Sequence, residues 1–341
     1  MATPSSAKER LLRVPRTVRT MRALRRFERE FTITSTTHDM DSYRMRAIMD
    51  THPAFGKWVS RRSLGGGSGA SLLRQPPSTM ANESGVTEAV EGLSRDGYYV
   101  FPNRAPDAFV SAVRDFALSA PCLARGIDSD PAPYPRGNAT VGRYDFSENT
   151  MLECEQVQDF SSDPVFAEIA RRYLGQDVVQ DLVALWWTAP APHQDASLNA
   201  QMFHQDRDRL SFLKFFLYVT DVREDTGPHI YLTGSHRKLD KRLRHDGRIT
   251  DEAIRSTGEW SRVERLVAPA GTLMAVDTAG LHKGEVPLVD DRLVLQVEFS
   301  TSLFGAPFEL PQFPASKLAR ARYASMPDVL RRWAACPSIT H

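Results

Sequence analysis

The chain has few cysteines and no long apolar run. Of its 341 residues only three are cysteine, Cys122, Cys154 and Cys336, and no two of them form a CxxC pair. An odd number at wide spacing argues against a disulfide framework and against a thiolate zinc site, so we expect free thiols. No stretch approaches the roughly 18 apolar residues of a membrane-spanning helix. The first residues also lack the apolar core of a secretory signal, so we expect a cytoplasmic protein without a membrane span.

An excess of charge of one sign is missing as well. The formal net charge is +1 at pH 7, because 43 lysines and arginines face 42 aspartates and glutamates. A field this weak favours no polyanionic partner, and we expect no nucleic acid to bind. The hydrophobic and charged fractions, 41% and 25%, are those of an ordinary globular protein. The oligomeric state cannot be predicted from these features.

Basic residues are concentrated near the N-terminus. Apolar residues recur every three or four positions between Val18 and Phe31, among many arginines, which predicts a helical basic extension over residues 1–62. Residues 63–86 are rich in Gly, Ser and Pro and are predicted to be a linker. Three interpretations of the extension stay open. It packs on its own domain, it contacts an acidic partner or surface, or it is an organelle transit peptide, although three glutamates interrupt the acid-poor pattern of such peptides.

A globular domain is predicted over residues 87–315, followed by a C-terminal helix and tail over residues 316–341. DGYYVF predicts a strand and PDAFVSAVRDFAL a helix. A second helix, PVFAEIARRYL, has Asp163 as its N-cap and Gly175 as its stop. ASKLARARYASMPDVLRRW predicts one last helix on the outside. Between these helices lie five strand-like runs: VVQDLVALWW, SFLKFFLYVTDV, HIYLTG, GTLMAVD and RLVLQVEFSTS. Many short strands predict a β-sandwich or barrel.

The segment FHQD carries the chemistry. Residues i and i+2 of a strand face the same side, so His204 and Asp206 can share one metal ion. His282 follows the strand-like GTLMAVD and would complete the two-histidine, one-carboxylate triad of non-haem iron(II) oxygenases. A second HQD, His193 to Asp195, is the alternative. Its surroundings resemble a loop, whereas His204 precedes an apolar strand that fixes ligand geometry better.

Arg292 is a candidate for binding a carboxylate. It follows His282 by ten residues and begins RLVLQVEF. A guanidinium binds a carboxylate with two parallel N–H groups, as a dicarboxylate co-substrate near the metal would require. A surface ion pair with Asp290 or Asp291 is the alternative interpretation. Arg292, Val294, Gln296 and Glu298 share one strand face by alternation.

The motifs in this order resemble the phytanoyl-CoA dioxygenase family. HxD is followed by a strand, TGPHIYLTGSHR, LHKG and an arginine ten positions on, and DGYYVF and RRYLGQDV resemble the family's earlier segments. The likeness extends from Thr87 to Ser302. It implies a mainly β fold with flanking helices, the double-stranded β-helix or jelly roll related to cupins.

The same resemblance implies the cofactors and the reaction. Fe(II) would be bound by His204, Asp206 and His282, and 2-oxoglutarate would place its distal carboxylate on Arg292, with O2 as oxidant. The implied enzyme is a dioxygenase that hydroxylates or otherwise oxidises a small molecule, and we interpret the substrate as a secondary metabolite. Halogenating relatives replace the Asp of HxD by Gly or Ala, so Asp206 favours hydroxylation or a related oxidation.

One position departs from the family's pattern. Relatives often carry Ser or Thr two residues after the distal histidine, where it helps to bind 2-oxoglutarate, and this chain has Gly284. Lys214 is a candidate substitute, because a lysine inside an apolar strand needs a partner. The alternative is that Lys214 reaches solvent at a strand edge. Gln201 is a further candidate for cofactor binding.

Other polar and aromatic residues are assigned less specifically. Pocket contacts are predicted for Trp186, Trp187, Gln201 and Gln296, with core packing as the alternative for the two tryptophans. The resemblance implies that His236 of the GSH turn is structural. His229 is interpreted as a loop residue at the pocket, in a position where many relatives have an apolar side chain.

Three rival functions use the same fold. The first is a cupin-like metalloenzyme, an oxygenase or epimerase, that does not need 2-oxoglutarate, and succinate formation would separate it. The second is a non-catalytic jelly roll that binds a small molecule or a partner chain without iron. The third is a zinc hydrolase, although the sequence has no general base of the HExxH type.

Overall fold

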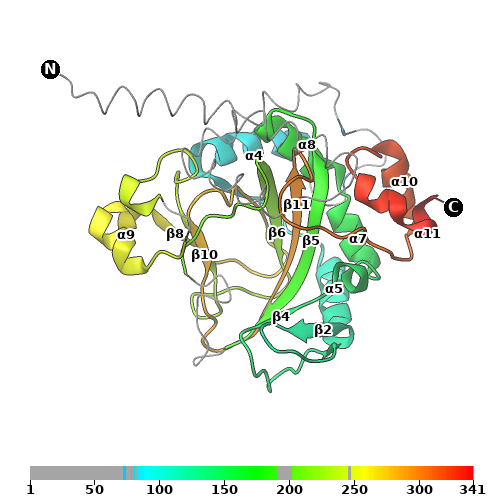
Figure 1. The fold of residues 1–341 in the computed structure, drawn as a ribbon, viewed down its shortest axis with the longest axis horizontal. Coiled ribbons are helices and arrows are strands. Elements are labelled where there is room, and N and C mark those ends of the chain that lie inside the picture. Colours follow the sequence, from blue (N-terminus) through cyan, green and yellow to red (C-terminus); the bar gives the residue numbers. More distant parts are fainter. Residues whose placement is uncertain are drawn as a thin grey trace, which may run out of the picture.

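The computed structural model describes residues 72–73, 78, 80, 83–190, 202–244 and 247–340. The predicted basic extension, most of the predicted linker, Gln201 and the second HQD segment lie outside these residues. Within them the chain forms two antiparallel sheets, with most helices beside the larger sheet and the helix at residues 251–257 beside the smaller one (Figure 1).

The elements follow one another in a mixed order. The strands are β1 (Tyr98–Val100), β2 (Pro121–Ala124), β3 (Ala132–Pro133), β4 (Arg143–Asp145), β5 (Val179–Thr188), β6 (Phe212–Tyr218), β7 (His229–Leu232), β8 (Val263–Leu266), β9 (Leu273–Val276), β10 (His282–Gly284) and β11 (Arg292–Ser300). The α-helices are α4 (Glu83–Asp96), α5 (Asp107–Ser119), α6 (Glu148–Met151), α7 (Glu155–Ser161), α8 (Pro164–Leu174), α9 (Asp251–Thr257), α10 (Lys317–Ser325) and α11 (Pro337–Thr340). Three 3-10 helices are η1 (Lys241–Leu243), η2 (Glu259–Arg262) and η3 (Arg331–Ala335).

The connectivity of the two sheets defines the fold. The larger sheet has the order β1-β9-β6-β11-β5-β4-β2-β3, and the smaller has the order β10-β7-β8. From β6 to β11 the chain passes between the sheets at every connection except the one from β7 to β8. The segment between β5 and β6 joins the smaller sheet through the His204–His282 bridge. This is a double-stranded β-helix, and the predicted fold class is confirmed.

Successive side chains of β6 point alternately into the core and into a cavity. All seven residues of FLKFFLY are buried. Leu213, Phe215 and Leu217 belong to the core between the larger sheet and the helices, where Phe215 stacks on Phe166 of α8 at 4.7 Å. Their neighbours Lys214, Phe216 and Tyr218 face the space between the two sheets instead. Figure 1 shows β10 of the smaller sheet on one side and β6, β11 and β5 of the larger sheet on the other.

Two helix predictions have different outcomes. α8 begins after Asp163, whose carboxylate accepts a hydrogen bond from Val165 N at 3.0 Å, and ends at Gly175 with φ 71°, as predicted. The single last helix is wrong. α10 ends at Ser325, and after Pro327 the chain continues as η3 and α11, because proline lacks the N–H that a helix interior needs.

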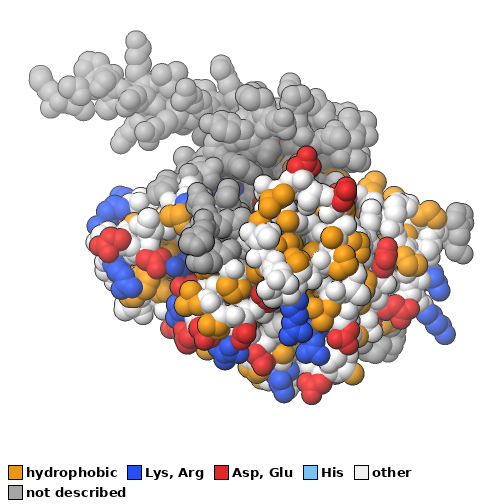
Figure 2. Space-filling view, turned by 90° about the horizontal axis from the view of Figure 1, so that it is seen from below, with side chains coloured by type: hydrophobic (Ala, Val, Ile, Leu, Met, Phe, Trp, Pro, Cys, Tyr) orange, Lys and Arg blue, Asp and Glu red, His pale blue; other side chains and the backbone are white. Residues whose placement is uncertain are grey.

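Three expectations from the sequence, on the cysteines, on a membrane span and on surface charge, can be compared with the described residues. All three cysteines are buried thiols outside any disulfide, and burial raises the pKa of the Cys122 thiol to about 11. No helix in the described part of the chain has the length and apolar content to cross a membrane. On the face shown in Figure 2, acidic and basic side chains are interspersed wherever the structure is described. That mixture agrees with the small net charge.

We predict that Asp163 stabilises the helical layer. Asp163→Ala removes the capping oxygen of α8 and the charge that lies 3.5 Å from the buried Arg322 guanidinium. We expect the free energy of unfolding to fall by about 2 kcal/mol, measured by urea denaturation. Asp163→Asn keeps a capping oxygen and should lose less. Equal stability of all three proteins would contradict this role.

Candidate metal centre

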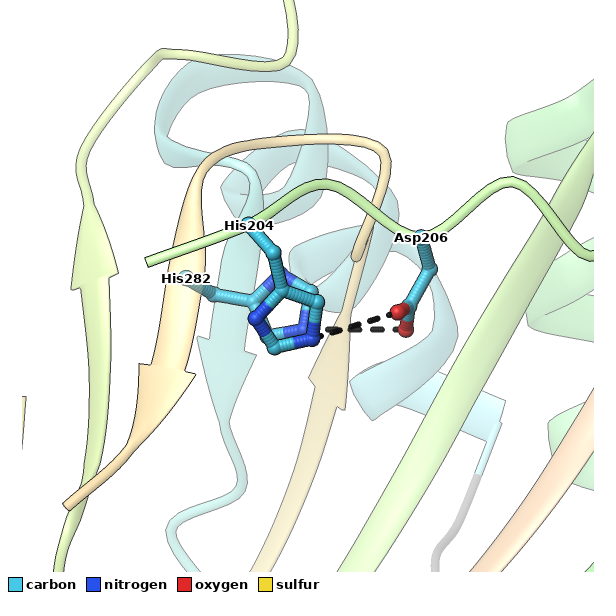
Figure 3. A group of neighbouring side chains, drawn as sticks. All are labelled: His204, Asp206 and His282. Atoms are coloured by element: carbon cyan, nitrogen blue, oxygen red, sulfur yellow. Dashed lines mark ion pairs between the residues drawn. The ribbon is translucent and has the colours of Figure 1, made fainter. Parts of the chain in front are cut away.

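Three side chains converge between the sheets. One ligand atom from each of His204, Asp206 and His282 lies within 4.8 Å of the other two, which makes this group the candidate cluster among the described residues. His204 Nε2 is 3.4 Å from Asp206 Oδ1, and His282 Nε2 is 3.6 Å from Asp206 Oδ2. Figure 3 shows the two imidazoles side by side, with the carboxylate facing their edges.

Backbone pairing brings these residues together from distant parts of the sequence. His204 N donates to His282 O at 2.9 Å, and His282 N donates to His204 O at 3.0 Å. Asp206 N donates to Thr278 O at 2.8 Å. The interpretation of FHQD as a regular strand is therefore only partly right, since His204 forms an isolated bridge and Asp206 lies in an irregular segment just beyond it.

The GSH turn supports the segment that carries His282. Ser235 Oγ accepts a hydrogen bond from Leu281 N at 2.7 Å, and Gly234 N donates to Asp96 O at 2.7 Å. Gly234 has φ 73°, a conformation that favours glycine. His236 is buried and is not one of the three clustered residues.

Both imidazoles have their inner nitrogen free for a ligand. His204 Nδ1 lies 2.9 Å from Met202 O, and His282 Nδ1 lies 3.0 Å from Gly280 O. Because a carbonyl can only accept, each Nδ1 carries the proton and each Nε2 presents its lone pair to the centre. This tautomer is the one that a metal-binding histidine needs.

The electrostatics keep the trio in its ligating form. Burial, and then the neighbouring His204, lower the pKa of His282 to about 3, so its imidazole is neutral. Burial alone would raise the pKa of Asp206, but neighbouring groups, chiefly the Lys214 ammonium, outweigh it and hold that pKa well below its ordinary value. The site thus combines the neutral imidazole of His282 with an ionised carboxylate.

Lys214 lies inside a group of carboxylates rather than at a strand edge. Its side chain is only 7% exposed, and Nζ donates to Asp206 Oδ2 at 2.7 Å and to Asp208 Oδ2 at 3.0 Å. Glu298 Oε2 is 3.2 Å away. These anions outweigh burial and raise the pKa of Lys214 well above its usual value. The solvent-reaching alternative is wrong, and co-substrate binding by Lys214 stays a prediction.

A second pair of buried acids continues this group. Burial and the nearby Asp181 raise the pKa of Glu298 well above its ordinary range. Asp181 itself pairs with Arg209 at 2.8 Å, and both side chains are almost fully buried. The carboxyl groups therefore outnumber the cations in this part of the interior.

Arg292 points into the molecule and not toward the acids beside it in the sequence. It is 5% exposed. Its Nη1 donates to Gly227 O, and its Nη2 donates to Thr188 Oγ1 at 3.3 Å. Asp290 pairs with Arg223 instead. No carboxylate within the described ranges lies within ion-pair distance of Arg292, so the surface-pair alternative is wrong.

A cavity of about 210 Å³ adjoins the trio. The predicted pocket residues Trp186 and Gln296 line it, together with Arg292, His229 and Gly284. Its remaining walls are mainly apolar or cationic: Arg143, Leu182, Ala184, Lys214, Phe216, Tyr218, Met274 and Val294. The predicted inward face of β11 is therefore correct.

Two assignments around the cavity change with the structure, and one cavity residue was not predicted. Trp187 faces the core, where it stacks on Tyr134 at 4.6 Å, so its pocket role is wrong. His229 lies in β7 and not in a loop, although its place at the pocket is confirmed. Arg143, whose guanidinium lies 4.4 Å above the Trp186 ring, was not predicted, because only the pairing of β4 with β5 brings it here.

The family model for phytanoyl-CoA dioxygenase (PhyH) matches residues 93–286, more than half of the chain. The chain belongs to the phytanoyl-CoA dioxygenase family. The family uses Fe(II), 2-oxoglutarate and O2, and membership identifies the chain as an oxygenase of this cofactor class. The match spans the trio and ends before Arg292. No curated protein sequence matches the chain significantly.

Solved structures resemble the chain only distantly. AviO1 from Streptomyces viridochromogenes Tue57 is 15% identical with a TM-score of 0.43, covering 65% of this chain and 97% of that one. SnoN, a non-heme alpha ketoglutarate dependent epimerase from nogalamycin biosynthesis, is 17% identical at 0.44, covering 64% and 84%. EctD from S. alaskensis, crystallised with 2-oxoglutarate and 5-hydroxyectoine, is 14% identical at 0.43, covering 67% and 78%. Likenesses this distant say nothing about the substrate.

We predict that Lys214 stabilises the fold by balancing its carboxylates. Lys214→Met removes the ammonium and leaves buried negative charge, so the metal-free protein should lose about 3 kcal/mol of unfolding free energy. Lys283→Met is the matched control. Lys283 is similarly buried, but its partner Asp251 is 45% exposed, and we expect a loss of about 1 kcal/mol or less. Similar losses for the two variants in urea denaturation would contradict the prediction.

Proposed function

We propose that the chain is an Fe(II)- and 2-oxoglutarate-dependent dioxygenase that hydroxylates or otherwise oxidises a small molecule. Iron would be held by His204 Nε2, His282 Nε2 and a carboxylate oxygen of Asp206. The observation that carries the proposal is the convergence of these three atoms within 4.8 Å, with both Nδ1 atoms directed at backbone carbonyls.

The donor set fits the chemistry of the family. Two imidazoles and one carboxylate on one side of iron(II) leave positions open for co-substrate and oxygen. When bound with 2-oxoglutarate and O2, such a centre supplies the oxidant for a substrate C–H bond and releases succinate and carbon dioxide. Because Asp206 is present, its ligand position is not free for a halide, which favours oxygenation.

Arg292 would bind the distal carboxylate of 2-oxoglutarate. Its guanidinium is buried at the cavity and has no carboxylate partner among the described residues. Burying a cation without a counter-charge is costly, and burial lowers the pKa of this guanidinium. A bound dianion would supply the missing charge and fix the co-substrate relative to the trio.

The cavity supports a small substrate. Trp186, Phe216, Met274 and Val294 give it an apolar wall, and Gln296 adds a polar amide. Such a wall excludes water from the reacting atoms and orients an apolar skeleton, while a few polar groups fix its position. A secondary metabolite is the class that we propose to screen first.

We predict that Asp206 is required for the metal complex. Anaerobic titration of the protein with Fe(II) and 2-oxoglutarate should produce a weak visible charge-transfer band, and Asp206→Ala should abolish it or greatly weaken it. Asp195→Ala, which changes the other HQD, is the matched control and should titrate like the parent. If the two variants exchange these results, the second HQD supplies the ligand.

Product analysis separates the proposal from its rivals. A 2-oxoglutarate-dependent oxygenase forms succinate in an amount tied to the 2-oxoglutarate it consumes. A metalloenzyme that does not use this co-substrate would convert its substrate without forming succinate. A non-catalytic binding protein would show neither the visible band nor succinate.

A further inference from the structure

His229 lies opposite the glycine that follows the distal histidine. In the antiparallel pairing of β10 with β7, Gly284 is directly opposite His229, and His282 is opposite Tyr231. Directly opposite residues of such a pair are about 5 Å apart and project to the same face of the sheet. Gly284 has no side chain on this face of β10, and the His229 imidazole of the neighbouring strand β7 projects from the same face.

The His229 ring is a buried polar group without a protein partner for one of its nitrogens. The residue is 9% exposed, and its Nε2 is buried with no hydrogen-bond partner in the described part of the protein. The ring lines the cavity, stacks on the His282 ring at 5.3 Å and packs against Phe216 at 5.4 Å. A buried polar group without a partner is uncommon and indicates a missing ligand or water.

Arg292 reaches the same place from β11. A Cβ atom built on Gly284 would lie 3.3 Å from Arg292 Nη2. Arg292 Nη1 donates to the carbonyl of Gly227, two residues before His229. Arg292 is therefore near Gly284 through its guanidinium and His229 is opposite it across the strand pair, and both residues line the cavity.

Other candidate donors near Arg292 are already occupied or lie elsewhere. Tyr218 Oη donates to Leu266 O at 2.9 Å and accepts from His229 N. Thr188 Oγ1 accepts from Arg292 and is not a cavity residue. The Lys214 ammonium lies among three carboxylates. Gln296 is four residues from Arg292 along β11, roughly 13 Å in an extended strand.

We propose that His229 donates a hydrogen bond from its imidazole to the distal carboxylate of 2-oxoglutarate, beside Arg292, in place of a hydroxyl at position 284. The assignment rests on the proposed function, because it names a residue of the same co-substrate site. Arg292 supplies the charge, and His229 supplies a neutral, rigid donor on the other side of the carboxylate.

The test is a binding titration of the full chain rather than an activity assay. The visible band of the anaerobic Fe(II) complex is titrated with 2-oxoglutarate and, separately, with 2-oxobutyrate, which has the same oxo-acid group but no distal carboxylate. His229→Leu removes the donor and still fills the space beside Phe216. We expect it to weaken 2-oxoglutarate binding about tenfold and to leave 2-oxobutyrate binding unchanged.

Two further variants test the donor itself. His229→Gln keeps an N–H at similar reach and should bind 2-oxoglutarate within about threefold of the parent, which a purely structural role of the ring would not predict. Gly284→Ser, added to His229→Leu, should recover most of the affinity, since a Cβ at this position would lie near only the Arg292 guanidinium nitrogens, at 3.3 and 3.9 Å. His236→Ala, at a buried histidine outside the cavity, should not change either affinity.

The outcomes distinguish this inference from the proposed function. If the parent shows no band with 2-oxoglutarate, the proposed function fails. If the parent binds and Arg292→Ala weakens binding, but His229→Leu binds 2-oxoglutarate like the parent, His229 is not a co-substrate residue. Equal losses for 2-oxoglutarate and 2-oxobutyrate would also overturn the assignment, because they would place the effect at the metal.

Discussion

The site depends on one pair of backbone hydrogen bonds, between His204 and His282. These residues are far apart in the sequence, and the reciprocal bonds of 2.9 Å and 3.0 Å fix them opposite each other. With that pair formed, the Nδ1 atoms meet nearby carbonyls, and the Nε2 atoms face Asp206. The GSH turn, whose Ser235 holds the segment before His282, secures the same pair from the smaller sheet. Ligand geometry is therefore set by main-chain pairing between two distant segments of the chain.

Charge balance joins this pair to the larger sheet. Asp206 carries a charge that must be compensated whether or not a metal is bound, and the Lys214 ammonium from β6 provides the compensation. Lys214 in turn needs more than one carboxylate to be stable at its depth, which explains why Asp208 and Glu298 surround it. The carboxylate that faces the metal position is thus oriented by a cation on one side and by a backbone bond from its own N–H on the other.

Alternation and spacing in the sequence were sufficient to predict a β-sandwich or barrel and the shared face of β11, because these are local signals. The resemblance of the motifs to the family then implied the double-stranded β-helix. HxD, LHKG and an arginine ten residues later also predicted which side chains to examine, and the structure brings the three proposed ligands together. The sequence was not sufficient for Arg143, for the partners of Lys214 or for the break at Pro327 in the last helix. Arg143 and Lys214 depend on the pairing of strands distant in the sequence, which no local pattern reveals. Pro327 is a helix breaker, but the helical spacing of the apolar residues around it predicted one continuous helix.

The Gly284 position shows why a family motif is better understood as a set of chemical groups than as a string of residues. From the sequence alone, a glycine at this position indicates that the hydroxyl donor of the family is missing, and a nearby cation such as Lys214 is then the obvious substitute. In the sheet, however, the neighbours of Gly284 are set by register, and the residue across from it is His229. An imidazole is longer than a serine side chain. The His229 ring can therefore reach a carboxylate beside position 284, provided that the residue at 284 has no side chain in the way. The histidine on β7 and the glycine on β10 are therefore one feature, and neither explains the site without the other.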